Sequence, residues 1–288
     1  MLDDLLKVDL VNQSKDRTGK IRRLQEQYRR ALRGEAILRM MDIFADSPWA
    51  SFDGVDLPHP NRNTFLLVLR LYTTQAWTFG GDVARRCDAL VQRMNRRFLE
   101  HGDLGLQPDV IVLNQVLSAW GSCRDSNKSV EAAKKLNEMK KTLDYDESSY
   151  SHVLRACAWS DIDDNSRKVA VEVAHRTWDA LQEETELQNT SYMYAYYLQA
   201  CKYMKNADQR EDKATAAFLL CQKDGLVNKQ VLAELQKVVS PALYEKMHIS
   251  LNTNSAQTNR QDSRERHRGN QPDLQTKWEA NNSPDPQT

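Results

Sequence analysis

The sequence predicts an all-α fold, a right-handed α-solenoid of about four helix-turn-helix repeats with partial units at both ends. Three observations lead to this prediction. One short helical phrase recurs four times, each copy is followed by a second amphipathic segment, and the 288 residues include only 10 Gly and 8 Pro. A recurring helical unit with few helix-breaking residues is typical of repeat arrays.

The recurring phrase has an aromatic residue or Leu first, a large residue three positions later and Leu four positions later. Its copies are FLLVLRLY (Phe65–Tyr72), LNQVLSAW (Leu113–Trp120), YSHVLRAC (Tyr150–Cys157) and YAYYLQAC (Tyr194–Cys201). These spacings place the anchors on one side of a helix. The Ala that usually follows at the sixth offset allows a neighbouring helix to approach closely.

The second segments combine an apolar stripe with residues of high helix propensity. They are DVARRCDALVQRM (Asp82–Met94), SVEAAKKLNEMK (Ser129–Lys140), SRKVAVEVAHRTWDAL (Ser166–Leu181) and DKATAAFLLCQKDG (Asp212–Gly225). Ser129 and Ser166 are predicted N-caps, and Gly225 is a predicted helix stop.

The copies of the phrase begin 48, 37 and 44 residues apart. A helix pair of the tetratricopeptide type takes about 34 residues, so the excess is expected in loops. The sequence places these loops at RFLEHGDLGLQ (Arg97–Gln107) and SDIDDN (Ser160–Asn165).

The chain divides into four predicted regions. Residues 1–60 form N-terminal helices and an incomplete repeat, residues 61–225 the repeat array, and residues 226–250 a C-terminal partial repeat. Residues 251–288 are rich in Asn, Gln, Ser and Pro, which predicts a disordered tail because few apolar side chains are available for burial.

Composition excludes several classes of protein. Lys and Arg together number 40, as do Asp and Glu, so the chain lacks the basic excess of a typical nucleic-acid binder. No apolar run approaches the roughly 20 residues of a membrane span. The five cysteines are too widely spaced for a zinc site, and no catalytic or cofactor motif is present. We therefore expect no membrane contact, no metal, no cofactor and no catalysis.

The repeat units resemble the pentatricopeptide repeat family over about Asn61 to Gly225. The resemblance is carried by PDVIVLNQVLSAW followed by VEAAKKLNEMK, and then by YSHVLRACAW and YAYYLQACKYM. The pair Pro108–Asp109 ahead of a first helix is typical of the family. The unit Asp109–Leu143 is close to the family pattern, and the other units depart from it in length or in their first-helix residues.

This resemblance implies binding of single-stranded RNA at one base per repeat. In the family, the base is chosen by the residue after the first anchor and by the last residue of the repeat. The implied pairs are Leu66 with Asp109, Asn114 with Asp146, Ser151 with Thr190, and Ala195 with an undetermined partner. The predicted RNA-binding residues are therefore Asn114, Asp146, Ser151 and Thr190, with Asn and Asp the family's combination for uracil.

Two features depart from the family pattern or leave it open. Leu66 and Ala195 have no hydrogen-bonding side chain. A shift of one residue in the assumed end of the repeat would also replace Thr190 by Asn189 in its pair with Ser151. The family also implies a mitochondrion or plastid, although the N-terminal residues show no transit peptide.

Several residue groups allow more than one interpretation. Asp146 is also a candidate N-cap. The arginines of Arg22–Arg30, and Arg85, Arg86, Arg93, Arg96 and Arg97, are expected either to track phosphates or to form solvated helix faces. Tyr192, Tyr194, Tyr196, Tyr197 and Tyr203 are expected either to stack on bases or to pack between helices.

The sequence therefore supports two main functions. The first is non-catalytic, single-stranded RNA binding of the pentatricopeptide type in RNA processing or stability. The alternative is a protein–protein interaction scaffold on a tetratricopeptide-like helical array, favoured by the neutral charge and by Leu66 and Ala195. A third interpretation is an enzyme whose catalytic domain lies outside this chain.

Overall fold

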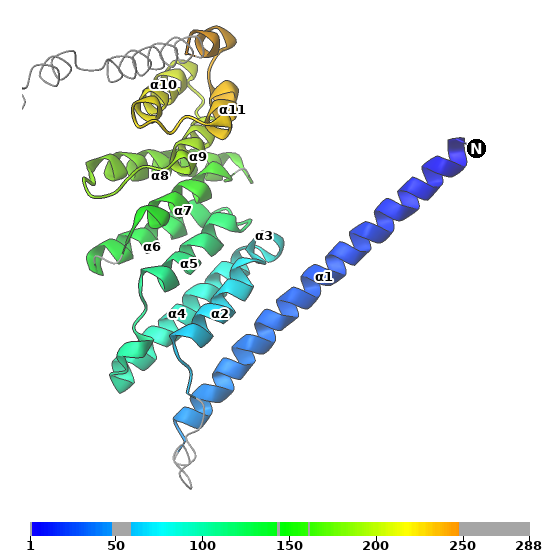
Figure 1. The fold of residues 1–288 in the computed structure, drawn as a ribbon, viewed down its shortest axis with the longest axis vertical. Coiled ribbons are helices and arrows are strands. Elements are labelled where there is room, and N and C mark those ends of the chain that lie inside the picture. The colour runs from blue at the N-terminus through cyan, green and yellow to red at the C-terminus, as the bar shows by residue number, and fades with distance from the viewer. Residues whose placement is uncertain (1, 48–58, 143–144, 161, 248–288) are drawn as a thin grey trace, which may run out of the picture. The chain divides into compact units, whose positions relative to one another are not determined.

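The computed structural model describes residues 2–47, 59–142, 145–160 and 162–247. All regular structure in these ranges is helical and no strand is found among them, which confirms the all-α prediction. The chain forms two compact units, residues 1–238 and residues 239–288. The first unit contains helices α1 to α11 (Figure 1). In the second, the described residues include a helical segment at 241–247.

The helices alternate between two sets along the chain. The first helices, which carry the recurring phrase or its C-terminal partial copy, are α2 (Arg62–Thr73), α5 (Val110–Ser122), α7 (Glu147–Ala158), α9 (Ser191–Cys201) and α11 (Lys229–Val238). The second helices are α4 (Gly81–His101), α6 (Lys128–Thr142), α8 (Asp164–Glu183) and α10 (Ala207–Lys223). The remaining helices are α1 (Leu2–Ala45), the short α3 (Ala76–Phe79) and the 3-10 helix η1 (Leu104–Leu106).

Each helix pair packs on its neighbours in chain order. The first helices form one row, because α2 contacts α5, α5 contacts α7, α7 contacts α9, and α9 contacts α11. Each second helix packs on the first helix before it and on the first helix after it. α1 precedes the row and packs on α2 (Figure 1). The described residues 59–238 are thus a series of helical hairpins.

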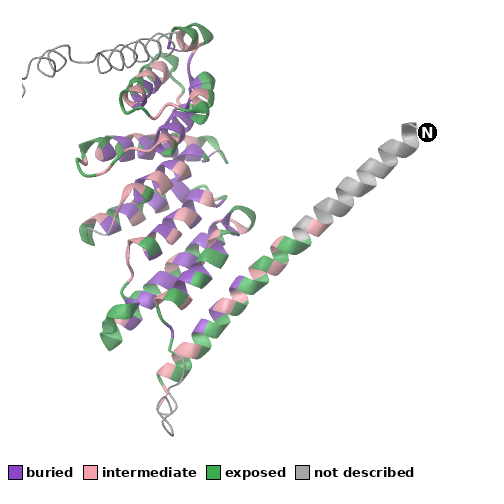
Figure 2. Cartoon of the chain, viewed as in Figure 1, coloured by how far each residue is buried: buried purple, intermediate pink, exposed green. Residues whose placement is uncertain are grey.

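The phrase forms the core because its anchors share one side of each first helix. Leu69, Leu117, Leu154 and Leu198, which occupy the same position in the four copies, are fully buried. The small residues Ala119, Ala156 and Ala200 are also buried, so successive first helices approach closely. In Figure 2 the buried residues lie where the stacked helices face one another.

Every first helix begins at a polar cap that accepts a backbone N–H from three residues later. These caps are Asn61, Asp109, Asp146, Thr190 and Asn228. Such caps satisfy one of the donors that a helix N-terminus leaves unpaired. The candidate cap Asp146 is confirmed in that role, and the start of each first helix is therefore set locally.

Both predicted serine caps of the second helices are wrong. Asp163 caps α8, and Ser166 is the third helical residue, whose hydroxyl accepts the Asp163 N–H in a capping box. α6 begins at Lys128, so Ser129 is already helical and is buried. The predicted stop at Gly225 is confirmed, because this residue follows α10 with a positive φ of 68°.

Both predicted loops are shorter than expected. α4 continues to His101 and ends at Gly102, whose φ of 66° is left-handed. The first half of the loop predicted at Arg97–Gln107 is therefore helix, and part of its second half is η1. α8 starts at Asp164, so the predicted loop Ser160–Asn165 loses its last two residues to the helix. The tail predicted at 251–288 lies outside the described residues.

Candidate nucleic-acid interface

The structure brings Asn114 and Asp146 together. The Asn114 Nδ2 donates to Asp146 Oδ1 over 2.9 Å, although the two residues lie 32 positions apart. The Ser149 hydroxyl lies 2.8 Å from Asn114 Oδ1 and 3.0 Å from Asp146 Oδ1. The same Asp146 oxygen accepts the Ser149 backbone N–H over 2.9 Å. The predicted pair is therefore part of the cap of α7.

This arrangement occupies both polar atoms of the Asn114 amide. Asn114 is 7% exposed, and its amide connects α5 to the first turn of α7. A primary amide has two N–H donors and two acceptor lone pairs, so one donor and one lone pair remain after these bonds. Asn114 thus has a structural role in addition to the base contact that the resemblance implies.

Ser151 and Thr190 are not joined in this way. Ser151 is half-buried on α7, and no hydrogen bond links it to Thr190 in the part of the chain that the structure describes. The Thr190 Oγ1 caps α9 and lies 3.4 Å from the Met193 N–H. The neighbouring Asn189 instead donates from Nδ2 to Asp224 Oδ2 over 3.2 Å and to the Tyr194 hydroxyl over 3.1 Å.

The remaining predicted positions lie in packing contacts. Leu66 and Ala195 are buried within the first-helix row. Asp109 caps α5, and its carboxylate forms a 2.5 Å ion pair with Arg62. The last-residue position of the repeat, occupied by Asp109, Asp146 and Thr190, is therefore the N-cap of the following first helix in each case.

The arginines of α4 pair with acidic residues of α1 and with Asp46, which directly follows it. Arg86 lies 3.1 Å from Glu35, Arg93 pairs with Asp42, and Arg97 lies 3.3 Å from Asp42 and 3.1 Å from Asp46. The matched pairs Glu35–Arg86, Asp42–Arg93 and Asp46–Arg97 are each 51 residues apart, so α1 and α4 run parallel here.

These ion pairs correct both interpretations of the α4 arginines for two of the five residues. Arg93 and Arg97 are neither a solvated face nor a free phosphate track, because their side chains are mostly buried and their charges are paired. Arg86 pairs with Glu35, but 41% of its side chain is exposed. Arg85 pairs with Asp82 and Asp125, whereas Arg96 is exposed. In α1, Arg29, Arg30 and Arg33 are exposed around Glu26, as expected of a solvated face.

A groove crosses the row of first helices at a place the sequence did not predict. Its volume is about 360 Å³. The side chains that line it are Trp77, Ser122, Arg155, Trp159, Tyr196 and Gln230. They come from α3, α5, α7 with its C-cap, α9 and α11. Among these described lining residues none is acidic.

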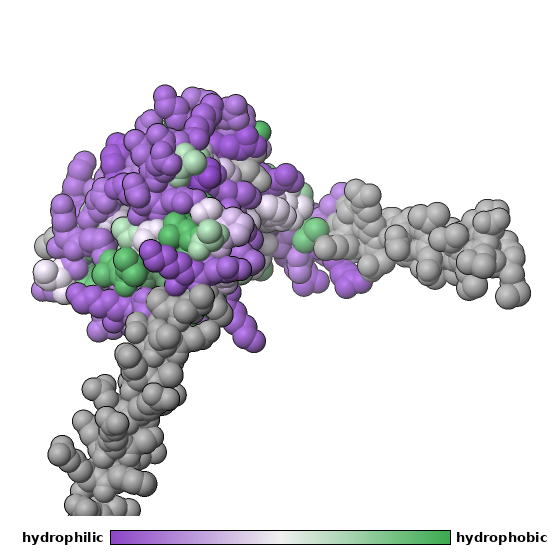
Figure 3. Space-filling view, turned by 90° about the horizontal axis from the view of Figure 1, so that it is seen from above, coloured by the Kyte–Doolittle hydropathy of each residue, from purple (hydrophilic) through white to green (hydrophobic). Residues whose placement is uncertain are grey.

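The groove presents aromatic and cationic groups to solvent. Trp77 is 58% exposed and Trp159 is 43% exposed. The Arg124 guanidinium lies 5.3 Å from the centre of the Trp77 ring, within the range of a cation–π contact. Seen from above, the described residues form a mostly hydrophilic surface with a few hydrophobic residues grouped together (Figure 3). A sequence signal was available, since the lining residues Ser122 and Trp159 both follow the first residue of their phrase by nine positions.

Gly121 shapes this groove by its small size. A Cβ added at this residue would lie 3.0 Å from the His152 carbonyl oxygen and 3.7 Å from the Arg155 Cδ. The missing side chain therefore allows α7 to approach α5. It also leaves room for Arg155 at the groove.

The tyrosine-rich helix α9 divides into core and surface residues. Tyr194 and Tyr197 are buried, and the Tyr197 ring stacks on Trp178 at 4.5 Å between centroids. The Tyr194 hydroxyl donates to Asp224 over 2.5 Å. The packing interpretation is confirmed for these two residues. Tyr192 is exposed, and the half-buried Tyr196 lines the groove.

The titratable groups near the first helices show the effect of burial. Desolvation and, secondly, the nearby Arg155 charge lower the pKa of His152 to about 4. Burial raises the pKa of each cysteine thiol to about 12, and all five cysteines are free. Within the described ranges no group of three potential metal ligands is found.

Comparisons of the chain with models of protein families, with curated proteins and with solved structures give no match. The pentatricopeptide interpretation therefore stays a prediction from the residues quoted above. In the described residues, no helix has the length and apolar character that a bilayer crossing requires.

Proposed function

We propose that the chain is a non-catalytic, single-stranded RNA-binding protein of the pentatricopeptide repeat type, acting in RNA processing or stability. In this proposal the helix pairs form a right-handed solenoid, and the groove across the first helices is its RNA-binding surface. The observation that carries the proposal is the lining of that groove, which is aromatic and basic and includes no acidic side chain.

The chemistry of the groove suits an unpaired strand. Base stacking on an aromatic side chain contributes about 1–3 kcal/mol per base and tolerates any base. Trp77, Trp159 and Tyr196 provide ring faces, and Arg124 and Arg155 provide positive charge for the phosphates. A duplex keeps its bases stacked inside the helix, so these rings favour single-stranded RNA.

Sequence preference is expected at one position of the strand. Asn114 and Asp146 keep the family's uracil combination in hydrogen-bonded contact. Ser151 and Thr190 are a second proposed pair, and no hydrogen bond joins them among the described residues. Leu66 and Ala195 cannot hydrogen-bond to a base edge. We therefore propose that most of the affinity comes from stacking and charge, with a single preferred uracil.

The packing order supports the solenoid. In solenoid arrays each repeat contacts only its neighbours, and one helix of each pair lines a continuous surface. The first-helix row from α2 to α11 has this order of contacts. The handedness follows from the family resemblance.

A binding selection from a random single-stranded RNA pool tests the function. The double variant Trp77→Ala/Trp159→Ala should bind the selected RNA at least tenfold more weakly, because each lost stack costs about 1–3 kcal/mol. Leu99→Ala/Leu104→Ala is the matched control, since these exposed apolar residues lie on α4 and η1. Absence of any enriched RNA at low salt would exclude the function.

A second candidate is a protein–protein interaction scaffold on a tetratricopeptide-like array. The observation that favours it is the exposure of Leu67, Leu71, Ile111 and Tyr192 on the first helices. Exposed apolar residues on a repeat surface are typical of peptide docking sites. This function predicts that Leu67→Ser/Ile111→Ser abolishes binding of a protein partner and leaves RNA binding unchanged.

A further inference from the structure

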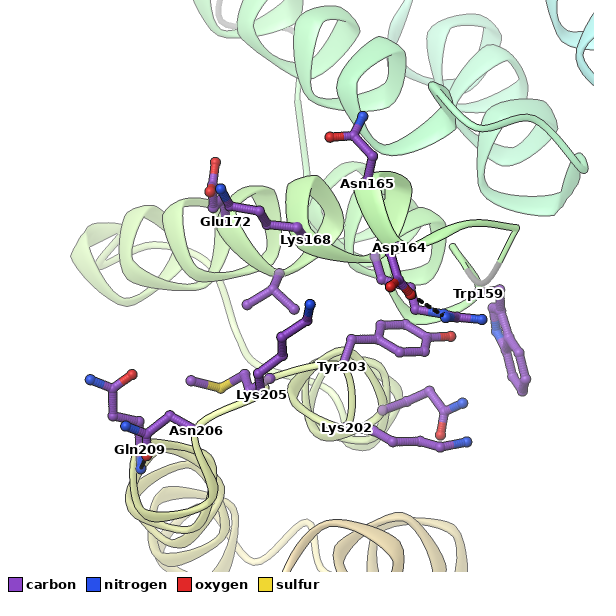
Figure 4. Close-up of a pocket in the computed structure, with 14 residues that line it drawn as sticks. Trp159, Asp164, Asn165, Lys168, Glu172, Lys202, Tyr203, Lys205, Asn206 and Gln209 are labelled. Atoms are coloured by element: carbon purple, nitrogen blue, oxygen red, sulfur yellow. Dashed lines mark hydrogen bonds and ion pairs between the residues drawn. The ribbon is translucent and has the colours of Figure 1, made fainter.

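A second and larger cleft lies beside the groove, between α8, the end of α9 and the start of α10 (Figure 4). Its volume is about 1130 Å³. None of the base-reading residues Asn114, Asp146, Ser151 and Thr190 lines it, although Tyr203 does. The family resemblance therefore does not account for this cleft.

The cleft carries an excess of positive charge. Four basic side chains line it, namely Arg167, Lys168, Lys202 and Lys205, against the acidic Asp164 and Glu172. Arg167 and Asp164 form an ion pair of 2.8 Å (Figure 4). The three lysines are exposed. The N-terminus of α10, capped by Asn206, also opens at the cleft and adds positive potential.

Gln199 provides an independent sign of a ligand. It lines the cleft but is only 6% exposed, and its Oε1 has no hydrogen-bond partner. A buried acceptor without a partner is uncommon in native proteins and is often satisfied by a bound group. An amide oxygen accepts from N–H donors, which the edges of nucleobases provide.

Trp159 connects the cleft with the groove. Its side chain lines both of them, so a strand that leaves the groove over this ring enters the cleft directly. Tyr203 adds a second ring to the cleft, and its hydroxyl donates to the Ala158 carbonyl over 3.0 Å. This bond holds the end of α9 against the end of α7.

We infer that the cleft binds further nucleotides of the same RNA strand as it continues past Trp159. Lys168, Lys202 and Lys205 contact the phosphates, and Gln199 Oε1 accepts an N–H from the edge of one base. This inference rests on the proposed function and extends it to a second binding surface. Peptide ligands are less suited, because the lysines would then require a strongly acidic sequence.

The test compares two strand lengths. Labelled oligouridines of about 4 and about 10 nucleotides span one and both surfaces, by the usual 4–16 nucleotides per single-strand site. The variant Lys202→Glu/Lys205→Glu should bind the long strand about tenfold more weakly and the short strand within about twofold of the wild type. The plot of log K against log salt should become shallower for the long strand. Its slope should decrease in magnitude by about 1.4, at about 0.7 for each of two lost phosphate contacts.

Two controls separate the cleft from general charge and from folding. Lys134→Glu/Lys213→Glu makes the same charge change on exposed lysines of α6 and α10 and should leave both affinities unchanged. Gln199→Leu should lower the affinity for the long strand about fivefold without changing the slope of log K against log salt. Its thermal unfolding midpoint should stay at or above that of the wild type, since it removes an unsatisfied buried acceptor.

Each outcome has a distinct meaning. If the wild type binds both strands and Lys202→Glu/Lys205→Glu binds the long strand with unchanged affinity, the cleft inference is overturned and the proposed function stands. If neither strand binds the wild type, the proposed function fails and the inference fails with it. Tight binding of oligoglutamate that depends on Lys202 and Lys205, without RNA binding, would assign the cleft to an acidic peptide instead.

Discussion

At the scale of single residues, the caps of the first helices do two tasks. Asp146 starts α7 and also binds the amide of Asn114 from the preceding hairpin. The chemistry that the family resemblance assigns to base reading is therefore also the chemistry that joins one repeat to the next. Stability and the proposed RNA binding should therefore depend on the same side chains.

Replacing Asp146 by Ala should destabilise the fold by about 2 kcal/mol. The lost cap costs about 1 kcal/mol, and the buried Asn114 N–H left without a partner costs a similar amount. Urea unfolding measures the change. Asp146→Asn should recover most of the loss, because an Asn side chain can also cap. Equal losses in both variants would contradict the double role.

His152 should make stability dependent on pH. Its pKa in the folded state, about 4, is below the ordinary value, so the unfolded state takes up a proton first as the pH falls. The neutral His152 makes its full contribution to the free energy of unfolding above about pH 6.5, and this contribution is lost progressively toward pH 4. The loss should be on the order of 1–2 kcal/mol, because the side chain is only half-buried.

Unfolding of His152→Gln measured across this pH range provides the comparison. Gln does not titrate, so the variant should lose less stability than the wild type between pH 6.5 and pH 4. The carboxylate of Glu35, whose pKa is lowered by its Tyr72 and Arg39 partners against the effect of burial, remains in both proteins. Parallel pH profiles would show that His152 contributes nothing.

At the scale of helices, the ion pairs between α1 and α4 define a second kind of contact. The row of first helices packs through apolar anchors. In contrast, α1 and the adjoining Asp46 are joined to α4 by charged side chains spaced 7 and 4 residues apart on both sides. Arg97 is buried, so its charge depends on Asp42 and Asp46. The attachment of α1 should therefore be sensitive to loss of a single acid.

Asp42→Ala should destabilise the molecule by about 2 kcal/mol. It removes a partner from Arg93 and from the buried Arg97, and an uncompensated buried charge is costly. The control Glu26→Ala should cost less than about 0.5 kcal/mol, because its ion pairs with Arg29, Arg30 and Arg33 are exposed. Chemical denaturation of both variants tests the difference, and similar losses would contradict it.

Gly121 should not tolerate a side chain. Gly121→Ala should cost about 1–3 kcal/mol, because the new Cβ would lie 3.0 Å from the His152 carbonyl and force α5 and α7 apart. Gly19→Ala in α1 is the control, with no atom within 4 Å of its Cβ, and should be stabilising through helix propensity. Thermal unfolding should therefore shift in opposite directions for the two variants.

At the scale of the whole molecule, the hairpins bury every thiol of the chain. Cys87, Cys123, Cys157, Cys201 and Cys221 are all buried, and burial raises their pKa values to about 12. Since the thiolate is the reactive form, a colorimetric thiol reagent at neutral pH should label none of them in the native protein. All five should react once denaturant is added. A thiol that reacts at once in the native protein would indicate local opening of its hairpin.

Much of the fold is readable from local patterns. The recurring phrase and the cap residues act within one or two helical turns, so periodicity and cap chemistry place the first helices. The errors at Ser129, Ser166 and Arg97–Gln107 arose at helix ends, where several neighbouring residues can cap or extend a helix. The candidate groove was not predicted, because its residues come from five separate helices.

The sequence by itself determined the all-α class, the position of the first helices and the juxtaposition expected for Asn114 and Asp146. Only the tertiary structure decided that the α4 arginines are neutralised by α1, that Asn114 is part of a cap, and that Trp77, Arg155 and Trp159 share a groove. The physical reason is distance along the chain. Capping and helix periodicity act over a few residues, whereas ion pairs across 51 residues and a surface drawn from five helices exist only after the hairpins have packed.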